Sequence, residues 1–386
     1  MTKRKLRMGM IGGSLDAFIG GVHRKAANLD GEIELVCGAF SSSPEKSKAT
    51  GDALYLNPHR VYGSFEEMIK KEKELPGDLR MDFVSIVTPN FMHYAPAKLA
   101  LENGFHVIID KPLAFSLTEA KSLKKIVEKT QLVFALTHTY TGYPMVKEAR
   151  SLVTPGEIGK VRKVYVEYPQ GWLSTFLENT GNKQAGWRTD PTKSGAGGAI
   201  GDIGTHAANL AEYITGSDIT EICALLNTVV KGRKLDDDSS MLLKFDNGAT
   251  GVLLATQVAA GEENNLNIRV YGEKGGLEWR QEEPNTLVLK WLDRPKEFYR
   301  AGGGYLSETS KKATRTPSGH PEGYLEAFAN IYMNFAKAVR DYKPGKKIDP
   351  AKYDFPDVSD GVKGMAFVDT VIKSSKTNQK WTKLKV

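Results

Sequence analysis

Short apolar runs alternate with helix-periodic segments through the first third of the chain. Strands are predicted at 6–13, 33–40, 81–89, 105–110 and 132–138, and helices at 18–30, 64–75, 92–104 and 116–130. Strands that alternate with helices of this length indicate βαβ crossovers. We therefore expect a doubly wound parallel sheet covered by helices on both faces.

The pattern changes near residue 140. Strands then follow one another at 160–168, 219–230, 239–259, 265–280 and 286–292, with a hairpin signal in "FDNGATG". Helices return at 203–216, 322–342 and 358–375, and 299–323 is predicted to be a surface loop. This predicts an α/β fold with two domains. Residues 1–140 form the doubly wound domain, and 141–386 form an α/β domain with a large, mostly antiparallel open sheet.

Composition narrows the class of protein. The 386 residues include only two cysteines, Cys37 and Cys223, so a disulfide scaffold is excluded and a reducing cytoplasm is expected. The net charge of +7 is dispersed along the chain, and no aromatic residues are interleaved with its basic stretches. Nucleic acid is therefore not an expected partner. No apolar run approaches the ~18 residues of a membrane span, and no secretory h-region follows the N-terminus.

A glycine-rich turn ends the first predicted strand. Gly12 and Gly13 precede Gly20 and Gly21, a spacing that differs from G-x-G-x-x-G. A lone glycine cluster is as often a turn with no ligand, but its place in the first βαβ unit favours a dinucleotide. The cofactor-binding candidates in this turn are Gly12, Gly13, Ser14, Phe18 and Ile19.

The second strand ends without the acidic residue that usually binds the ribose of NAD. Ser41 and Ser42 offer hydroxyl groups, and Lys46 could meet a 2′-phosphate. The alternative is a plain serine-rich helix cap. NAD is the expected cofactor, with NADP left open.

Two segments carry candidate catalytic residues. Lys111 follows a buried strand, where a partly desolvated ammonium could favour a substrate alkoxide; a surface lysine is the alternative. Asp202 and His206 are four residues apart and share one face of a helix, so the carboxylate could orient a general base. The alternative is a structural Asp–His pair, and the glycine-rich stretch 195–201 favours a site.

The motifs together resemble the Gfo/Idh/MocA oxidoreductase family over nearly the whole chain. The family's E-K-P motif resembles Asp110, Lys111 and Pro112, with Asp in place of Glu. Its D-x-x-x-H pair resembles Asp202 and His206. Its T-P-N-x-x-H cofactor segment resembles the residues Thr88, Pro89, Asn90 and His93.

The resemblance implies a Rossmann domain that binds NAD(P), and a second domain whose open sheet often forms homodimers or homotetramers. It implies oxidation or reduction at a secondary hydroxyl of a sugar or inositol. "YPQGWL" and "SGHPEGYLEAF" are similar to the subgroup of levoglucosan and scyllo-inositol or L-glucose dehydrogenases, which favours NAD and an unphosphorylated substrate.

Aromatic and polar residues flank the catalytic segments. Faces of tryptophan suit a sugar ring, although core packing is the usual role of a tryptophan. The substrate-binding candidates are Lys111, Tyr140, Trp172, Trp187, Arg188, Asp202, His206 and His320. No histidine or cysteine spacing suggests a metal site.

We therefore expect a dehydrogenase in which His206 removes the hydroxyl proton, Asp202 orients the ring and Lys111 stabilises the oxyanion. Two alternatives remain. The same fold could use NAD in a redox-neutral hydrolysis, elimination or isomerisation, or the protein could be a non-catalytic dinucleotide sensor.

Overall fold

The computed structural model describes residues 4–346 and 348–386. The chain divides into two compact units. The first runs to Thr139 and includes Phe328–Val362, and the second comprises Tyr140–Ala327 and Lys363–Val386. The break after Thr139 lies where the sequence pattern changes. Residues 328–362 differ from the prediction, because they pack within the first unit rather than the second.

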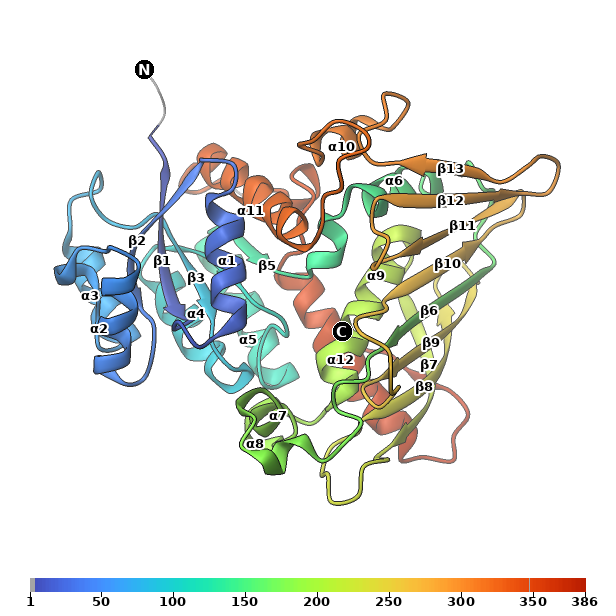
Figure 1. Ribbon diagram of the computed structural model, residues 1–386, viewed down its shortest axis with the longest axis horizontal. Helices are drawn as coiled ribbons and strands as arrows, with labels where there is room; N and C mark the ends of the chain where they lie inside the picture. Colours follow the sequence, from blue (N-terminus) through green and yellow to red (C-terminus); the bar gives the residue numbers. More distant parts are fainter. Residues whose placement is uncertain (1–3, 347) are drawn as a thin grey trace. The chain divides into compact units, whose positions relative to one another are not determined.

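The first unit has a five-stranded parallel sheet in the order β2-β1-β3-β4-β5 (Figure 1). Its strands are β1 (Leu6–Gly12), β2 (Ile33–Ala39), β3 (Phe83–Val87), β4 (His106–Ile109) and β5 (Phe134–Leu136). The strand order reverses between β1 and β3. This is the place where open α/β sheets bind ligands beyond the carboxyl ends of their strands.

Helices cover this sheet. They are α1 (Phe18–Asn28), α2 (Pro44–Ala53), α3 (Phe65–Glu74), α4 (Tyr94–Glu102), α5 (Leu117–Thr130) and α11 (Tyr324–Asp341). All five residues of β3 are buried, as a strand covered on both faces requires. Helix α11 contributes Phe335, whose ring centroid lies 5.0 Å from that of Phe83 in β3. This aromatic contact explains why α11 belongs to the first unit from Phe328 onward.

The second unit has a nine-stranded sheet in the order β13-β12-β11-β10-β6-β9-β8-β7-β14 (Figure 1). Its strands are β6 (Lys163–Pro169), β7 (Ile219–Asn227), β8 (Asp238–Phe245), β9 (Thr250–Thr256), β10 (Asn267–Tyr271), β11 (Gly275–Arg280), β12 (Thr286–Trp291), β13 (Glu297–Arg300) and β14 (Thr382–Lys383). Strands β6 and β9 pair in parallel, and the other pairs are antiparallel. The predicted α/β class, with one parallel sheet and one mostly antiparallel sheet, is confirmed.

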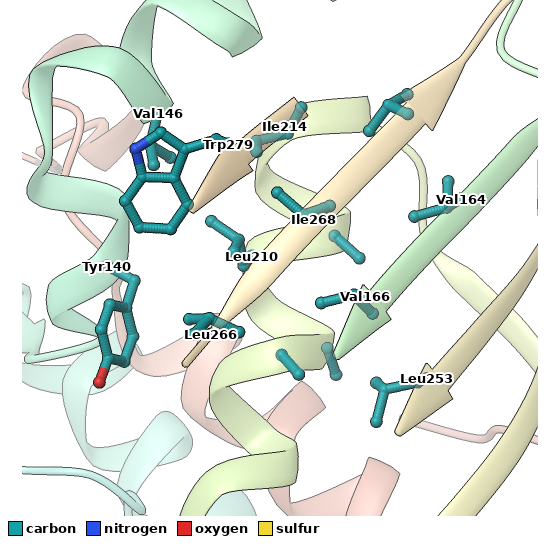
Figure 2. Packing of buried hydrophobic residues seen from close by; sticks show 14 of the residues in the cluster. Tyr140, Val146, Val164, Val166, Leu210, Ile214, Leu253, Leu266, Ile268 and Trp279 are labelled. Carbon is teal, nitrogen blue, oxygen red and sulfur yellow. The ribbon is translucent and has the colours of Figure 1, made fainter. Parts of the chain in front are cut away.

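One face of the second sheet is buried, as the alternation along β8 and β9 requires. Figure 2 shows this core, in which Val166, Leu253 and Ile268 from the sheet lie beside Leu210 of a covering helix. The helices of this unit include α6 (Pro144–Val153), α7 (Lys183–Arg188), α8 (Pro191–Ser194), α9 (Thr205–Thr215), α10 (Glu308–Lys312) and most of α12 (Val358–Ser375).

The other face of this sheet is open. Leu225, Leu242 and Leu254 are 58%, 45% and 36% exposed on neighbouring strands β7, β8 and β9. The segment 299–323 is not wholly a loop, since it contains part of β13 and all of α10. Within the described residues, no helix combines the length and apolar character needed to cross a membrane.

Candidate functional site

The glycine turn of the first unit is packed too tightly for side chains. Gly12 and Gly13 have φ of +80° and +74°, which favour glycine. A Cβ on Gly20, in the first turn of α1, would lie 2.4 Å from the Gly13 Cα. Helix α1 begins after Ala17, which gives no side-chain cap, and its first turn holds no acidic residue. A close-packed glycine turn that leads into a helix with no side-chain cap fits a pyrophosphate.

The candidate ribose end of this turn lies after β2. Ser43 caps α2 by accepting from the Lys46 N–H at 3.3 Å, and its hydroxyl lies 2.6 Å from the Glu45 carboxylate. The hydrogen bond from Ser43 holds the pKa of Glu45 below its usual value. Ser41 accepts from the Ser43 N–H, while Ser42 and Lys46 are exposed. Sequence reasoning overlooked Glu45, which is exposed next to Lys46.

The Thr88 segment and the Lys111 segment are tied together by His93. The ring nitrogens of this fully buried histidine lie 2.7 Å from the Pro112 carbonyl oxygen and 2.8 Å from the Thr88 carbonyl oxygen. Thr88 also donates to the Met92 carbonyl at 3.1 Å. Since the His93 ring contacts backbone on both sides, it holds the two loops beyond β3 and β4 in register. Asn90 is buried in the same segment.

Asp110 is the charged neighbour of Lys111. Burial raises the pKa of its carboxyl, but His23, the charge of Lys111 and the Thr137 hydroxyl together hold it well below its usual range. The Thr137 hydroxyl donates to Asp110 at 2.8 Å, and Nε2 of His23 lies 3.8 Å away. Burial, followed by the charge of Lys111, lowers the pKa of His138 to about 3. Asp110 is therefore an anion beside the half-buried Lys111.

The candidate residues of the second unit lie around a π-helical turn, η5 (Ile200–Gly204), that leads into α9. Turns of this type recur at functional sites. Asp236 pins the turn, because its carboxylate accepts from the N–H groups of Gly198 and Ile200 at 2.7 and 2.8 Å. A Cβ on Gly198 would lie 2.0 Å from the Asp236 carbonyl oxygen. This glycine therefore serves packing inside the protein, not the approach of a ligand.

Asp202 lies in this turn, and His206 follows in the first turn of α9. One oxygen of Asp202 accepts from the Gln257 amide at 2.9 Å and lies 3.3 Å from Nε of Arg188. The Arg188 guanidinium stacks 4.3 Å from the centroid of the Trp187 ring and 5.9 Å from that of Trp172. Arg188, Trp172 and Trp187 therefore gather beside the Asp202 carboxylate.

Two other candidates differ in setting. Tyr140 is buried, its ring lies 4.8 Å from that of His206, and its hydroxyl bonds to Tyr168 and Asn264. His320 is exposed at a loop tip, 3.3 Å from the Pro317 carbonyl oxygen.

Sequence reasoning missed the polar residues that join these groups, which are Tyr168, Gln170, Gln257 and Asn264. The signal in the sequence was weak: Gln170 lies two residues after the predicted strand 160–168, and Gln257 lies two residues before the end of the predicted segment 239–259.

Comparisons with known proteins match both units. Residues 6–138 match the oxidoreductase family with an NAD-binding Rossmann fold, and residues 146–278 match the GFO/IDH/MocA C-terminal domain. An oxidoreductase from Sinorhizobium meliloti is 44% identical, with a TM-score of 0.87 over 98% of this chain and 99% of that one.

Two further relatives carry names that describe an activity. An inositol dehydrogenase homologue from Azotobacter vinelandii, complexed with NAD+, is 32% identical with a TM-score of 0.91, covering 98% and 97% of the two chains. A second structure of that homologue holds NADH and myo-inositol, with a TM-score of 0.89. Levoglucosan dehydrogenase from Pseudarthrobacter phenanthrenivorans is 28% identical over 58% of this chain and 62% of its own length.

The glycine cradle, the uncapped helix and the two-unit architecture thus agree with the family profiles and with relatives that cover the whole chain. The chain belongs to the Gfo/Idh/MocA family of NAD-binding oxidoreductases.

Proposed function

We propose that this oxidoreductase oxidises a secondary hydroxyl of an unphosphorylated sugar, anhydrosugar or inositol to a ketone, with NAD as cofactor. The observation that carries the proposal is the cluster on the second unit, where Asp202 of the π-helical turn lies beside Arg188 and its stacked tryptophans. Aromatic faces and a charged hydrogen-bonding group suit the two sides of a polyol ring. The relative complexed with NADH and myo-inositol supports this substrate class.

When bound, NAD supplies the hydride acceptor. We propose that Lys111 donates a hydrogen bond to the reacting oxygen and stabilises negative charge as it develops there. His206 takes the hydroxyl proton, and the carboxylate of Asp202 keeps the imidazole oriented and favours its protonated form. The oxygen therefore loses a proton while its carbon loses a hydride, which leaves the ketone.

The surroundings of Lys111 support this role. Asp110 is ionised beside it, and His93 fixes the Pro112 carbonyl that follows it. A neighbouring carboxylate and a backbone carbonyl held by His93 restrict the direction in which the Lys111 side chain can point. Thr88, Pro89 and Asn90 of the adjoining loop, with Gly12 and Gly13, are proposed to hold the cofactor.

Arg188 supports an unphosphorylated substrate. Its Nε pairs with Asp202, and its Nη1 donates to the side chain of Gln184. Asp202 already balances the charge of this guanidinium, so it attracts a phosphate less than an unpaired arginine would, while its other N–H groups can still donate to a neutral hydroxyl. The NAD-binding Rossmann family profile and the relatives complexed with NAD+ and NADH support NAD as the cofactor.

A substrate screen tests the proposal. Anhydrosugars, monosaccharides, glycosides and inositols are each incubated with NAD or NADP, and reduced cofactor is read by absorbance. Lys111→Ala and His206→Asn should each lower kcat by about 10²- to 10⁴-fold and leave the Kd for NAD within a few-fold. Turnover of either variant near the wild-type rate would exclude its assigned role.

The same screen separates the alternatives. Product formed without net reduced cofactor indicates redox-neutral chemistry, and cofactor binding without turnover of any compound indicates a sensor. Measuring product by chromatography alongside absorbance distinguishes the two results.

We also propose that the open face of the second sheet mediates self-association. Leu225, Leu242 and Leu254 expose an apolar band on adjacent strands, and such patches mark interaction surfaces. Leu242→Asp should shift the protein toward the monomer in light scattering, whereas Leu79→Asp, at an exposed leucine of the first unit, should not. Wild-type protein that is monomeric at micromolar concentration would refute this surface.

A further inference from the structure

Behind Asp202, the second unit contains a continuous chain of polar side chains. The Gln257 amide donates to Asp202 at 2.9 Å and lies 3.3 Å from Oε1 of Gln170. The Gln170 amide donates to Oδ1 of Asn264 at 2.6 Å. Asn264 in turn reaches Tyr140, since its Nδ2 lies 3.3 Å from the tyrosine oxygen. One chain of hydrogen bonds therefore joins Asp202 to Tyr140.

The far end of the chain is a closed triangle. The Tyr168 hydroxyl donates to Oδ1 of Asn264 at 2.7 Å, and the two tyrosine hydroxyls bond to each other. Because the Tyr168 proton is committed to Asn264, the Tyr140 hydroxyl must donate to Tyr168 while accepting from Asn264. Both tyrosines are buried. The Tyr140 hydroxyl therefore has no remaining proton to offer a substrate.

The charge of Asp202 sets the direction of every bond in the chain. A carboxylate only accepts, so Gln257 must turn its NH₂ group toward it. The shared NH₂ then requires the oxygen of Gln170, which also accepts from the Trp172 indole at 3.1 Å. The NH₂ of Gln170 consequently faces Asn264, whose own NH₂ faces Tyr140. Each amide has one orientation that satisfies both neighbours.

Strand pairing brings the two glutamines together. Strands β6 and β9 are parallel, with Pro169 paired to Thr256. Gln170 and Gln257 are the residues that directly follow β6 and β9. Since the two strands are parallel, both glutamines lie at the same end of the sheet. The main chain fixes them there, because Gln170 N–H donates to the Thr256 carbonyl at 2.8 Å and Gln257 N–H donates to the Asp237 carbonyl at 2.8 Å.

Both ends of the chain border the proposed base. Asp202 lies in the turn before His206, and the Tyr140 ring packs edge-on against the His206 ring with centroids 4.8 Å apart. We infer that Gln257, Gln170 and Asn264 are positioning residues that hold the Asp202 carboxylate and the Tyr140 ring around His206. The inference rests on the proposed function of Asp202 and His206. Tyr140 was expected to bind substrate; we infer instead that its ring packs against the imidazole of His206 and limits its orientation.

The test substitutes Gln257 in two ways. Gln257→Met removes the donor, and kcat should fall about 10- to 100-fold with the Kd for NAD unchanged, since misplacement by ~1 Å is enough for such a loss. Gln257→Glu keeps the shape, but sets a second carboxylate against Asp202, next to Arg188 and His206. Only its protonated form can donate to Asp202, so its kcat relative to wild type should rise as pH is lowered.

Asn265→Asp is the matched control. It makes the same amide-to-carboxylate change in the same loop, but the side chain of Asn265 bonds to Glu262 and Asn267, which lie outside the chain of hydrogen bonds. Its kcat relative to wild type should not vary with pH. If the kcat of Gln257→Glu relative to wild type is also independent of pH, the inference is overturned, because the shape of the side chain alone would then account for the role of Gln257.

A readout without substrate separates this inference from the proposed function. The imidazole of His206 is titrated by NMR and assigned with His206→Asn. In Gln257→Met, Asp202 Oδ2 loses the amide donor and keeps Arg188, so the carboxylate is held less firmly beside His206 and the pKa of His206 should fall, while Asn265→Asp should leave it unchanged. An unchanged titration in Gln257→Met refutes the positioning role, even if no substrate is found. A wild-type enzyme without dehydrogenase activity refutes only the proposed function.

Discussion

Two adjacent glycines of α1, Gly20 and Gly21, offer a stringent prediction about the cofactor turn. Both are helical, so replacing either with alanine gains the same helix propensity, up to about 1 kcal/mol. Their surroundings differ. A Cβ on Gly20 would lie 2.4 Å from the Gly13 Cα and 2.8 Å from the Gly13 carbonyl oxygen, whereas one on Gly21 meets nothing within 4 Å.

The distances set the size of the difference. Carbon atoms in contact lie about 3.5–4.0 Å apart, so alanine at 20 must push the turn away by roughly 1 Å or more. The Gly13 atoms in question belong to the main chain, so they cannot rotate away as a side chain could. Overpacking of this kind costs about 1–3 kcal/mol, which exceeds the helix gain. Gly21→Ala should stabilise the protein by up to ~1 kcal/mol. Gly20→Ala should therefore be about 1–3 kcal/mol less stable than Gly21→Ala.

The assay pairs urea unfolding of each variant with NAD titration by calorimetry. We expect Gly20→Ala to bind NAD at least about tenfold more weakly, since ~1.4 kcal/mol of displacement energy corresponds to a factor of ten. Gly21→Ala should bind like the wild type. Equal stability and equal affinity of the two variants would refute the assignment of this turn as a close-packed pyrophosphate cradle.

Two further predictions concern stability. Burial lowers the pKa of His106 to about 4, so below pH 6.5 the unfolded chain binds a proton that the folded chain excludes. Stability should then fall by about 1.4 kcal/mol per pH unit down to about pH 4, and His106→Gln should remove this share of the slope in urea titrations. Buried Arg233 pairs with Glu178 and Asp237, so Arg233→Met should cost about 3–5 kcal/mol. Arg162→Met, at an exposed ion pair, should cost less than about 1 kcal/mol in the same measurement; similar losses would contradict the argument.

Periodic elements were predictable from the sequence, and the exceptions have physical causes. Helix α2 was missed because its buried residues include Ser47, Thr50 and Gly51 and supply no apolar stripe. Helix α6 was missed for the opposite reason. Most of its residues are buried, including Lys147 and Glu148, so these two charged residues do not mark a solvent face.

Site residues were likewise predictable only where their position depends on local sequence. Lys111 was predictable as a strand-end residue, because its position depends on a local strand and loop. Gln170, Gln257 and Asn264 were not, because their proximity depends on the pairing of β6 with β9, which no local pattern encodes. Tyr140 was identified by its place next to a motif, but only the triangle with Tyr168 and Asn264 shows that its hydroxyl is occupied.

The parallel pairing of β6 with β9 also has a consequence for folding. Gln170 and Gln257 are 87 residues apart in the chain, and η5 and α9 lie between them. Closing so long a segment is entropically costly before its contacts form, so such pairings tend to form slowly. During refolding from urea, helical circular dichroism should therefore recover before turnover does. The lag between the two signals would measure how late this strand pair closes.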